Sequence, residues 1–249
     1  FLGMMSISEA FARSQNIPAV RISEAMGRER VRRAANAFGL NSSMAEGPAL
    51  ALGASEASLL EMTAAYAGIL NGGSSVRPYG FTSLSLAREA TPLMSIGSGI
   101  GERVIEEESA HRLVWMMSQV LEAPYGTGRR ARLPDGRQAA GKTGTTSSAR
   151  DAWFVGFTAD YVVGVWMGND DNAPLTGVTG GGLPADIWRE VMVRINQGVP
   201  RHPLPMIAPE PQVLEPPTNR GMPGTVQTTD SGGLGDSVRG LLQGILGGN

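Results

Sequence analysis

The chain contains no cysteine and only one lysine, and both features restrict the chemistry open to it. Without cysteine it can form no disulfide, carry no thiol nucleophile and offer no thiolate ligand to a metal. Every basic residue except Lys142 is an arginine, so a compact ammonium group with three rotatable donors occurs at one position only. The chain also lacks an apolar run of about eighteen residues, and no segment is predicted to span a membrane.

The charge balance excludes a second group of functions. With a net charge of −2 and its acidic residues mixed among the arginines, the chain has no basic face of the kind that nucleic-acid binding needs. Its two histidines, His111 and His202, have no partner at metal-ligand spacing. We therefore expect no nucleic acid, no metal and no cofactor, in a globular chain of ordinary apolar content.

Helical periodicity runs through much of the sequence. Ser6 with Glu9, and Ser58 with Glu61, have the spacing of a capping box, and Asn16 can cap a further helix. Apolar stripes and stop signals predict six helices, over about 6–14, 16–26, 29–38, 59–70, 107–122 and 184–197.

The period changes to that of strands in the second half of the chain. The segments 152–158 and 161–167 are nearly continuous apolar runs joined by a short turn, which predicts a hairpin covered on both faces. Residues 138–146 lead directly into this hairpin and complete a predicted three-stranded antiparallel run. The stretch 75–104 shows no clear pattern.

The C-terminal part of the chain differs in composition from the rest. Prolines recur from position 200 to 223, and a Gly/Ser-rich end follows them. We therefore expect a domain over residues 1–199 and a mostly disordered tail over residues 200–249.

The single lysine satisfies two short patterns. One is the P-loop, G-x-x-x-x-G-K-[ST], over residues 136–143. A working P-loop needs a buried strand before it and a helix after it. Here a basic loop precedes the pattern and an apolar hairpin follows it, so nucleotide binding is the weaker interpretation.

The other pattern is Lys-Thr-Gly at residues 142–144, one of the three elements shared by penicillin-binding proteins and class A β-lactamases. It requires a strand beside the active site and, upstream, a Ser-x-Asn tripeptide between helices. Ser14-Gln15-Asn16 lies between the first two predicted helices. Alone, Asn16 could equally be a helix cap and nothing more.

Longer stretches around both motifs resemble class A penicillin-binding proteins. The similar segments are 12–21, 50–56, 60–67, 71–73 and 126–157, the last of which includes Gly-Lys-Thr-Gly-Thr-Thr at 141–146. The resemblance extends to about residue 189 and implies the α/β (α+β) fold of penicillin-binding proteins and serine β-lactamases. In that fold an antiparallel sheet is flanked by helices, and this chain would hold it incompletely at the N-terminus.

The resemblance also implies a reaction, the cross-linking of peptidoglycan stem peptides. A serine attacks a D-alanyl-D-alanine bond, D-alanine leaves, and an amine of a second stem peptide takes the acyl group. β-Lactams imitate the donor and trap the serine. By resemblance, Ser14 would relay a proton to the amine, Asn16 would hold the donor peptide bond, and Lys142 would bond Ser14 and supply positive potential.

The remaining predicted site residues follow Lys142. Thr143 and Thr145 would grip the terminal carboxylate of the donor through their hydroxyl groups. The Thr145 backbone N–H would be one of two oxyanion donors. The substrate-binding residues implied by the resemblance are Asn16, Thr143, Gly144, Thr145 and Thr146.

The sequence departs from the family pattern at the nucleophile. Because Lys142 is the only lysine, the chain contains no separate Ser-x-x-Lys. We expect the nucleophile and its base upstream of residue 1, together with a glycosyltransferase domain and a membrane anchor on the periplasmic side of the inner membrane. The chain alone would then be inactive. The alternatives are a β-lactamase-like hydrolase, a non-catalytic cell-wall-binding module and the P-loop protein.

Overall fold

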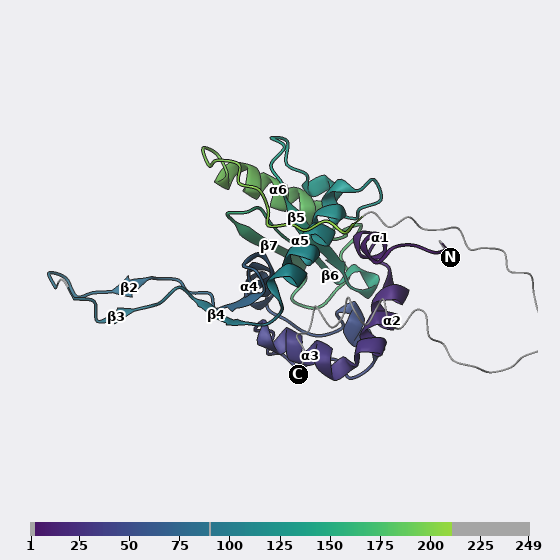
Figure 1. Ribbon diagram of the computed structural model, residues 1–249, viewed down its shortest axis with the longest axis horizontal. Coiled ribbons are helices and arrows are strands. Elements are labelled where there is room, and N and C mark those ends of the chain that lie inside the picture. Colours follow the sequence, from purple (N-terminus) through teal and green to yellow (C-terminus); the bar gives the residue numbers. More distant parts are fainter. Residues whose placement is uncertain (1–2, 90, 211–249) are drawn as a thin grey trace, which may run out of the picture.

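The computed structural model describes residues 3–89 and 91–210, which form a body of helices around a small sheet and one long projecting ribbon (Figure 1). The helices are α1 Ile7–Ala12, α2 Asn16–Met26, α3 Arg28–Ala37, α4 Leu59–Leu70, α5 Glu107–Glu122 and α6 Leu183–Ile195. The strands are β1 Ser74–Val76, β2 Ser83–Leu84, β3 Met94–Ser95, β4 Ile100–Arg103, β5 Ala140–Thr145, β6 Asp151–Phe157 and β7 Val162–Gly168. Short 3-10 helices occur at Pro48–Leu52, Arg129–Ala131 and Ser147–Ala149.

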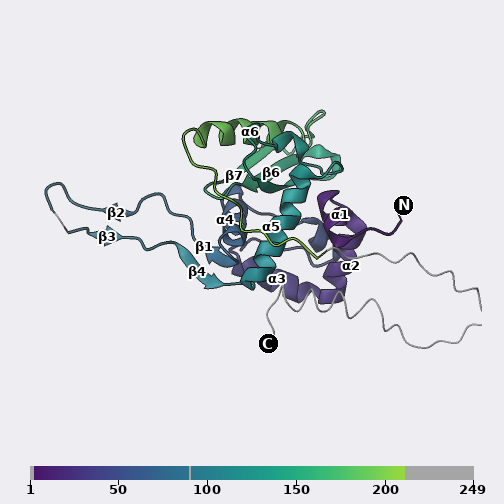
Figure 2. The same ribbon diagram turned by 45° about the horizontal axis from the view of Figure 1, so that its top comes forward.

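The central sheet is antiparallel, with strand order β5-β6-β7, as the sequence predicted. Lys142 of β5 pairs with Val155 of β6, and Phe154 of β6 pairs with Val165 of β7. Helix α6 covers one face of the sheet, while α4 and α5 lie on the other (Figure 2). The strand that carries Lys142 is therefore at an edge of this sheet.

The core is built around β6, the middle strand. Trp188 of α6 is fully buried and packs on Phe154, with 5.2 Å between the ring centroids. Its indole N–H lies 3.2 Å from the Gly156 carbonyl and 3.1 Å from the Val163 carbonyl. This one side chain satisfies its polar atom and ties α6 to β6 and β7.

Helices cover both strands of the hairpin on both faces as predicted, α6 on one face and α4 on the other, but β7 is less buried than β6. Most of β6 is buried, whereas the residues of β7 are half-buried and Trp166 is 40% exposed. β7 is the other edge of the sheet, so it has a neighbouring strand on one side only.

The helix starts follow the local capping signals, with one exception. Ser58 and Glu61 form the predicted capping box, and the Ser6 hydroxyl accepts the Glu9 N–H. Asn16, however, is the first residue of α2 rather than its cap, which is Gln15. Asn16 therefore does not cap α2, and its amide is not used at the helix terminus.

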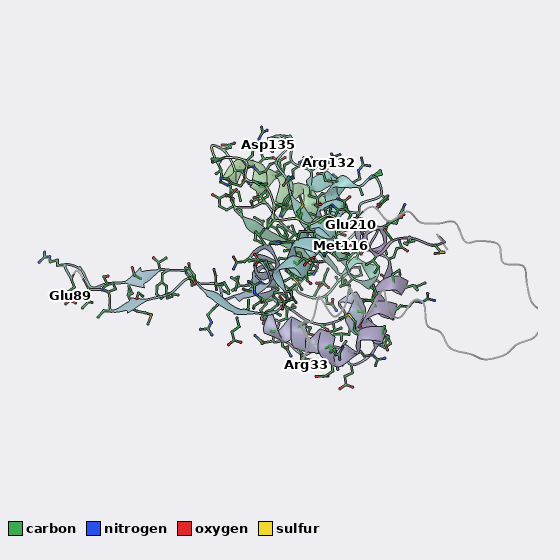
Figure 3. All side chains as sticks on the ribbon, viewed as in Figure 1. Arg33, Glu89, Met116, Arg132, Asp135 and Glu210 are labelled. Atoms are coloured by element: carbon green, nitrogen blue, oxygen red, sulfur yellow. The ribbon has the colours of Figure 1, made fainter. Side chains whose placement is uncertain are left out.

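The stretch without a clear pattern forms a two-part ribbon. β1 pairs with β4 and β2 pairs with β3, both antiparallel. The ribbon extends far from the body, and its side chains, including that of the labelled Glu89, project outward from the ribbon (Figure 3). Leu84 and Met94, a cross-strand pair, are each 53% exposed.

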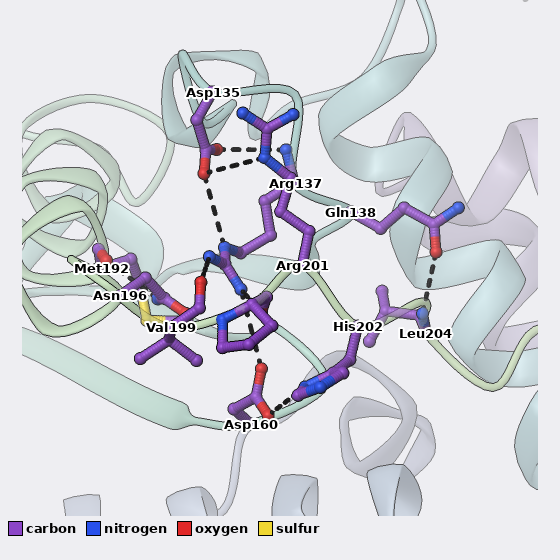
Figure 4. Close-up of polar contacts among 11 residues, drawn as sticks. Asp135, Arg137, Gln138, Asp160, Met192, Asn196, Val199, Arg201, His202 and Leu204 are labelled. Carbon is purple, nitrogen blue, oxygen red and sulfur yellow. Dashed lines mark hydrogen bonds and ion pairs between the residues drawn. The ribbon is translucent and has the colours of Figure 1, made fainter.

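The beginning of the predicted tail, residues 200–207, packs against the body. Leu204 is 5% exposed and belongs to a buried cluster with Phe157. Its backbone N–H donates to the side chain of Gln138 at 2.8 Å (Figure 4). Arg137 donates to the carbonyls of Val199 and Pro200 at 2.7 and 2.8 Å.

Proline-rich composition did not prevent this packing, because prolines restrict the unfolded chain and so lower the entropy lost on ordering. The rest of the predicted tail, residues 211–249, lies outside the described residues. Within the described ranges, no helix has the length and apolar character needed to cross a bilayer.

Candidate active site

Ser14 and Lys142, separated by 128 positions in the chain, meet at the junction of α1, α2 and β5. The Lys142 Nζ lies 2.8 Å from the Ser14 Oγ. Ser14 has a positive φ of 54°, a conformation that costs a non-glycine residue about 1 kcal/mol. Its N–H donates to the Phe11 carbonyl and that of Gln15 to the Ala10 carbonyl, so two hydrogen bonds hold the turn that presents the serine.

The ammonium group of Lys142 is held between polar and apolar neighbours. Its Nζ lies 3.1 Å from the Thr143 carbonyl and 5.7 Å from the centroid of the Phe11 ring. Burial lowers the pKa of Lys142 to about 8, because desolvation disfavours the charged form. The group therefore exchanges its proton within the range where a general acid or base is useful.

A cavity of about 810 Å³ surrounds this pair. Six of the seven predicted site residues line it, namely Ser14, Asn16, Lys142, Thr143, Gly144 and Thr145. Most of the other lining side chains are largely apolar, among them Phe11, Ile22 and Tyr66, and Gln15, Thr127 and Thr179 add polar groups. Such a mixture suits a ligand with one charged end and an apolar body.

Thr146 is the predicted residue that does not line this cavity. Its hydroxyl oxygen accepts the backbone N–H of Asp151 at 2.8 Å, and its hydroxyl donates to a carboxylate oxygen of the same residue at 3.3 Å. Both contacts close the connection between β5 and β6. Gly144 has a packing role in addition to its place in the cavity, since a Cβ there would lie 3.2 Å from the Trp153 Cβ.

The sequence reasoning missed Thr127, which also lines the cavity. Its hydroxyl oxygen lies 2.8 Å from that of Thr143, and its N–H donates to the Ala12 carbonyl at 3.2 Å. Residues 126–128 read Gly-Thr-Gly and belong to a segment that resembles the family. The tripeptide itself gives no sign that Thr127 contacts Thr143, sixteen positions further along the chain.

The sequence reasoning also missed a glycine loop, Gly180-Gly181-Gly182, that closes over β5. The Gly180 N–H donates to the Thr145 hydroxyl oxygen at 3.0 Å. A Cβ at Gly180 would overlap the carbonyl oxygens of Gly144 and Trp153, and one at Gly181 would overlap that of Thr127. Only glycine lets the loop approach the strand this closely.

The geometry excludes the P-loop interpretation. Lys142 and Thr143 lie within β5, and a strand end with a short 3-10 helix follows them. A P-loop lysine instead begins a helix whose N-terminal N–H groups bind phosphate.

The comparisons with known proteins agree with the fold. The family model "Penicillin binding protein transpeptidase domain" matches residues 2–192. Penicillin-binding protein 1A of Rickettsia typhi is 31% identical over 192 residues, covering 68% of this chain and 24% of the relative. Penicillin-binding protein 1B of Haemophilus influenzae is 32% identical, covering 76% and 24%. The chain thus spans about a quarter of the length of these relatives.

The solved structures agree on the architecture. The crystal structure of Haemophilus influenzae penicillin-binding protein 1A matches with a TM-score of 0.70 and 26% identity, covering 80% of this chain and 35% of that one. PonA1 of Mycobacterium tuberculosis, in complex with penicillin V, matches with a TM-score of 0.72 and 25% identity, covering 85% and 64%. The predicted fold class is confirmed, and the chain belongs to the transpeptidase-domain family of penicillin-binding proteins, within class A.

Proposed function

We propose that this chain is the C-terminal portion of a serine-type D-alanyl-D-alanine transpeptidase domain that cross-links peptidoglycan stem peptides through an acyl-serine intermediate. The observation that carries the proposal is the 2.8 Å contact between Lys142 Nζ and Ser14 Oγ inside a cavity that Thr143 and Thr145 also line. β-Lactams would occupy the same cavity, as the penicillin V complex of PonA1 suggests for this family.

In the hydrogen bond between Lys142 and Ser14, the lysine is the donor and the serine oxygen is the acceptor. The hydroxyl proton of Ser14 therefore remains free to pass to an amine in the cavity. With a pKa of about 8, Lys142 can replace that proton near neutral pH. Ser14 and Lys142 would thus form a proton relay to the leaving D-alanine and from the attacking amine.

The other residues would hold the donor peptide. The Asn16 amide, free of any capping role, would bind the donor peptide bond. The hydroxyls of Thr143 and Thr145 would bind the terminal carboxylate, and the Thr145 N–H would stabilise the oxyanion, a contact whose loss costs about 3–4 kcal/mol of barrier. We assign Thr146 a supporting role at the strand end instead of direct substrate contact.

The nucleophile would come from outside this sequence. Residue 139, three positions before the only lysine, is an alanine, so the chain holds no Ser-x-x-Lys. In the proposal, residues 3–210 provide the walls that bind and protonate the substrate, and a preceding segment provides the serine and its base. The full protein would act on the periplasmic side of the inner membrane through an anchor that also lies outside this sequence.

Intact-mass analysis after incubation with penicillin tests the proposal. We expect no added mass on the folded chain, and acylation once the chain is extended upstream to include a Ser-x-x-Lys segment. As a matched control, a lysine variant of the extended protein, Lys142→Met, should acylate far more slowly. An adduct on a serine of the present chain would overturn the assignment of the nucleophile, and turnover of nitrocefin would favour the β-lactamase alternative.

A further inference from the structure

Thr127 joins three separate walls of the cavity. Its N–H donates to the carbonyl of Ala12, two residues before Ser14. Its hydroxyl lies 2.8 Å from the Thr143 hydroxyl on β5. Its carbonyl oxygen lies against Gly181, so close that a Cβ at Gly181 would overlap it. A residue held from three directions has little freedom, so its hydroxyl oxygen stays in one place.

An outer donor to each threonine hydroxyl of β5 favours the orientation in which the hydroxyl proton faces the cavity. A hydroxyl has one proton to donate and two lone pairs to accept with. Thr145 accepts the N–H of Gly180 at 3.0 Å, which leaves its own proton free for a ligand. Thr143 has only one hydroxyl neighbour in the described structure, Thr127, and either oxygen of that pair can be the donor.

We infer that Thr127 is a positioning residue of the carboxylate subsite: it donates to the Thr143 oxygen and thereby directs the Thr143 proton into the cavity. The inference rests on the proposed function, because the ligand is the terminal carboxylate of a stem peptide. An anion beside Thr143 favours this direction, since a hydroxyl that donates to a carboxylate becomes a better acceptor for Thr127. The backbone N–H of Gly180 occupies the acceptor side of the Thr145 hydroxyl in the same way that the Thr127 hydroxyl would occupy that of Thr143.

The test compares two probes, acetyl-D-alanyl-D-alanine and the same dipeptide with a C-terminal amide. Binding to the full chain is followed through the NMR signal of Lys142, which is the only lysine. Wild-type protein should bind the carboxylate more tightly than the amide. Thr127→Val, which keeps the shape but removes the donor, should reduce carboxylate affinity about tenfold and leave amide affinity unchanged.

Matched variants separate positioning from a structural effect. Thr127→Ser retains the hydroxyl and should restore the preference for the carboxylate. Thr82→Val, on the exposed ribbon, should behave as wild type. If valine does not fit beside Gly181 and the variant fails to fold, Thr127→Ala provides the same comparison.

The other possible results contradict either the role of Thr127 or the proposed function. An unchanged preference in Thr127→Val, or an equal loss of affinity for both probes, overturns the role of Thr127 and leaves the proposed function intact. Wild-type protein that binds neither probe, or does not prefer the carboxylate, contradicts the proposed function itself, and the role of Thr127 falls with it.

Discussion

Lys142 should release its proton near pH 8 in the folded chain. Burial lowers its pKa to about 8, whereas a lysine in an unfolded chain titrates near its ordinary value of about 10.4. The measurement is direct, because one lysine in the sequence gives one side-chain signal after labelling with ¹³C-lysine. A pH titration of that signal in folded and in urea-unfolded protein provides both values.

The same difference predicts a pH-dependent stability with a defined sign. Between about pH 8 and 10.5 the unfolded state binds more protons at this lysine than the folded state, so the free energy of unfolding rises with pH. A full pKa difference of this size would contribute about 1.5 kcal/mol between pH 8 and 9.5. Because Lys142 is only partly buried, we expect about 1 kcal/mol after allowance for solvent screening.

The control for this stability effect is Lys142→Met, which should lack the rise. Measurements should stop near pH 9.5, because burial raises the pKa of Tyr66 and opposes the effect at higher pH. Ser14→Ala should leave the pKa near 8, since burial and not the serine is the cause. A folded-state pKa at or above 10 would refute the reasoning and remove Lys142 from the proposed proton relay.

Three further perturbations test other parts of the structure. Gly180→Ala should displace the glycine loop and release the hydroxyl of Thr145, which would appear as weaker binding of acetyl-D-alanyl-D-alanine together with a lower melting temperature, because the new Cβ overlaps two backbone carbonyl oxygens. Arg137→Met should cost about 3 kcal/mol in urea unfolding and expose residues 199–207 to limited proteolysis, because it removes both carbonyl contacts of a side chain that is 2% exposed. Ser58→Ala should lower the free energy of unfolding by about 1 kcal/mol through loss of the capping box, and an effect below experimental error would count against that cap.

The elements whose signals are local could be predicted. The capping box at Ser58, the apolar stripe of residues 107–122 and the hairpin of residues 151–168 are each specified by neighbours within a few positions. The ribbon of residues 74–103 was missed because its exposed strands carry neither an apolar stripe nor a compact turn signal. β7 is less buried than its apolar sequence suggested because it lies at an edge of the sheet, and a strand's place in the sheet depends on the rest of the chain.

The site could be predicted in its residue types but only in part in its geometry. The resemblance named Ser14, Lys142 and the two threonines of β5, and all four line one cavity. The sequence left a helix cap open as the alternative role of Asn16, since an asparagine between helices looks the same in either role, and the structure shows that it does not cap α2. Leu204 was placed in a disordered tail, because its burial depends on Gln138 and Phe157, far away in the chain.

By itself, the sequence determined the order of the predicted helices and of the three strands of the central sheet, the family, and the presence of one lysine beside 20 arginines. Those properties depend on local periodicity, on short motifs and on composition. Tertiary structure alone decided the 2.8 Å distance between Lys142 and Ser14, whose contact the resemblance had implied, the lowering of the lysine's pKa by burial, and the contact of Thr127 with Thr143. Distance and desolvation depend on how separate segments pack, and packing is a property of the whole folded chain.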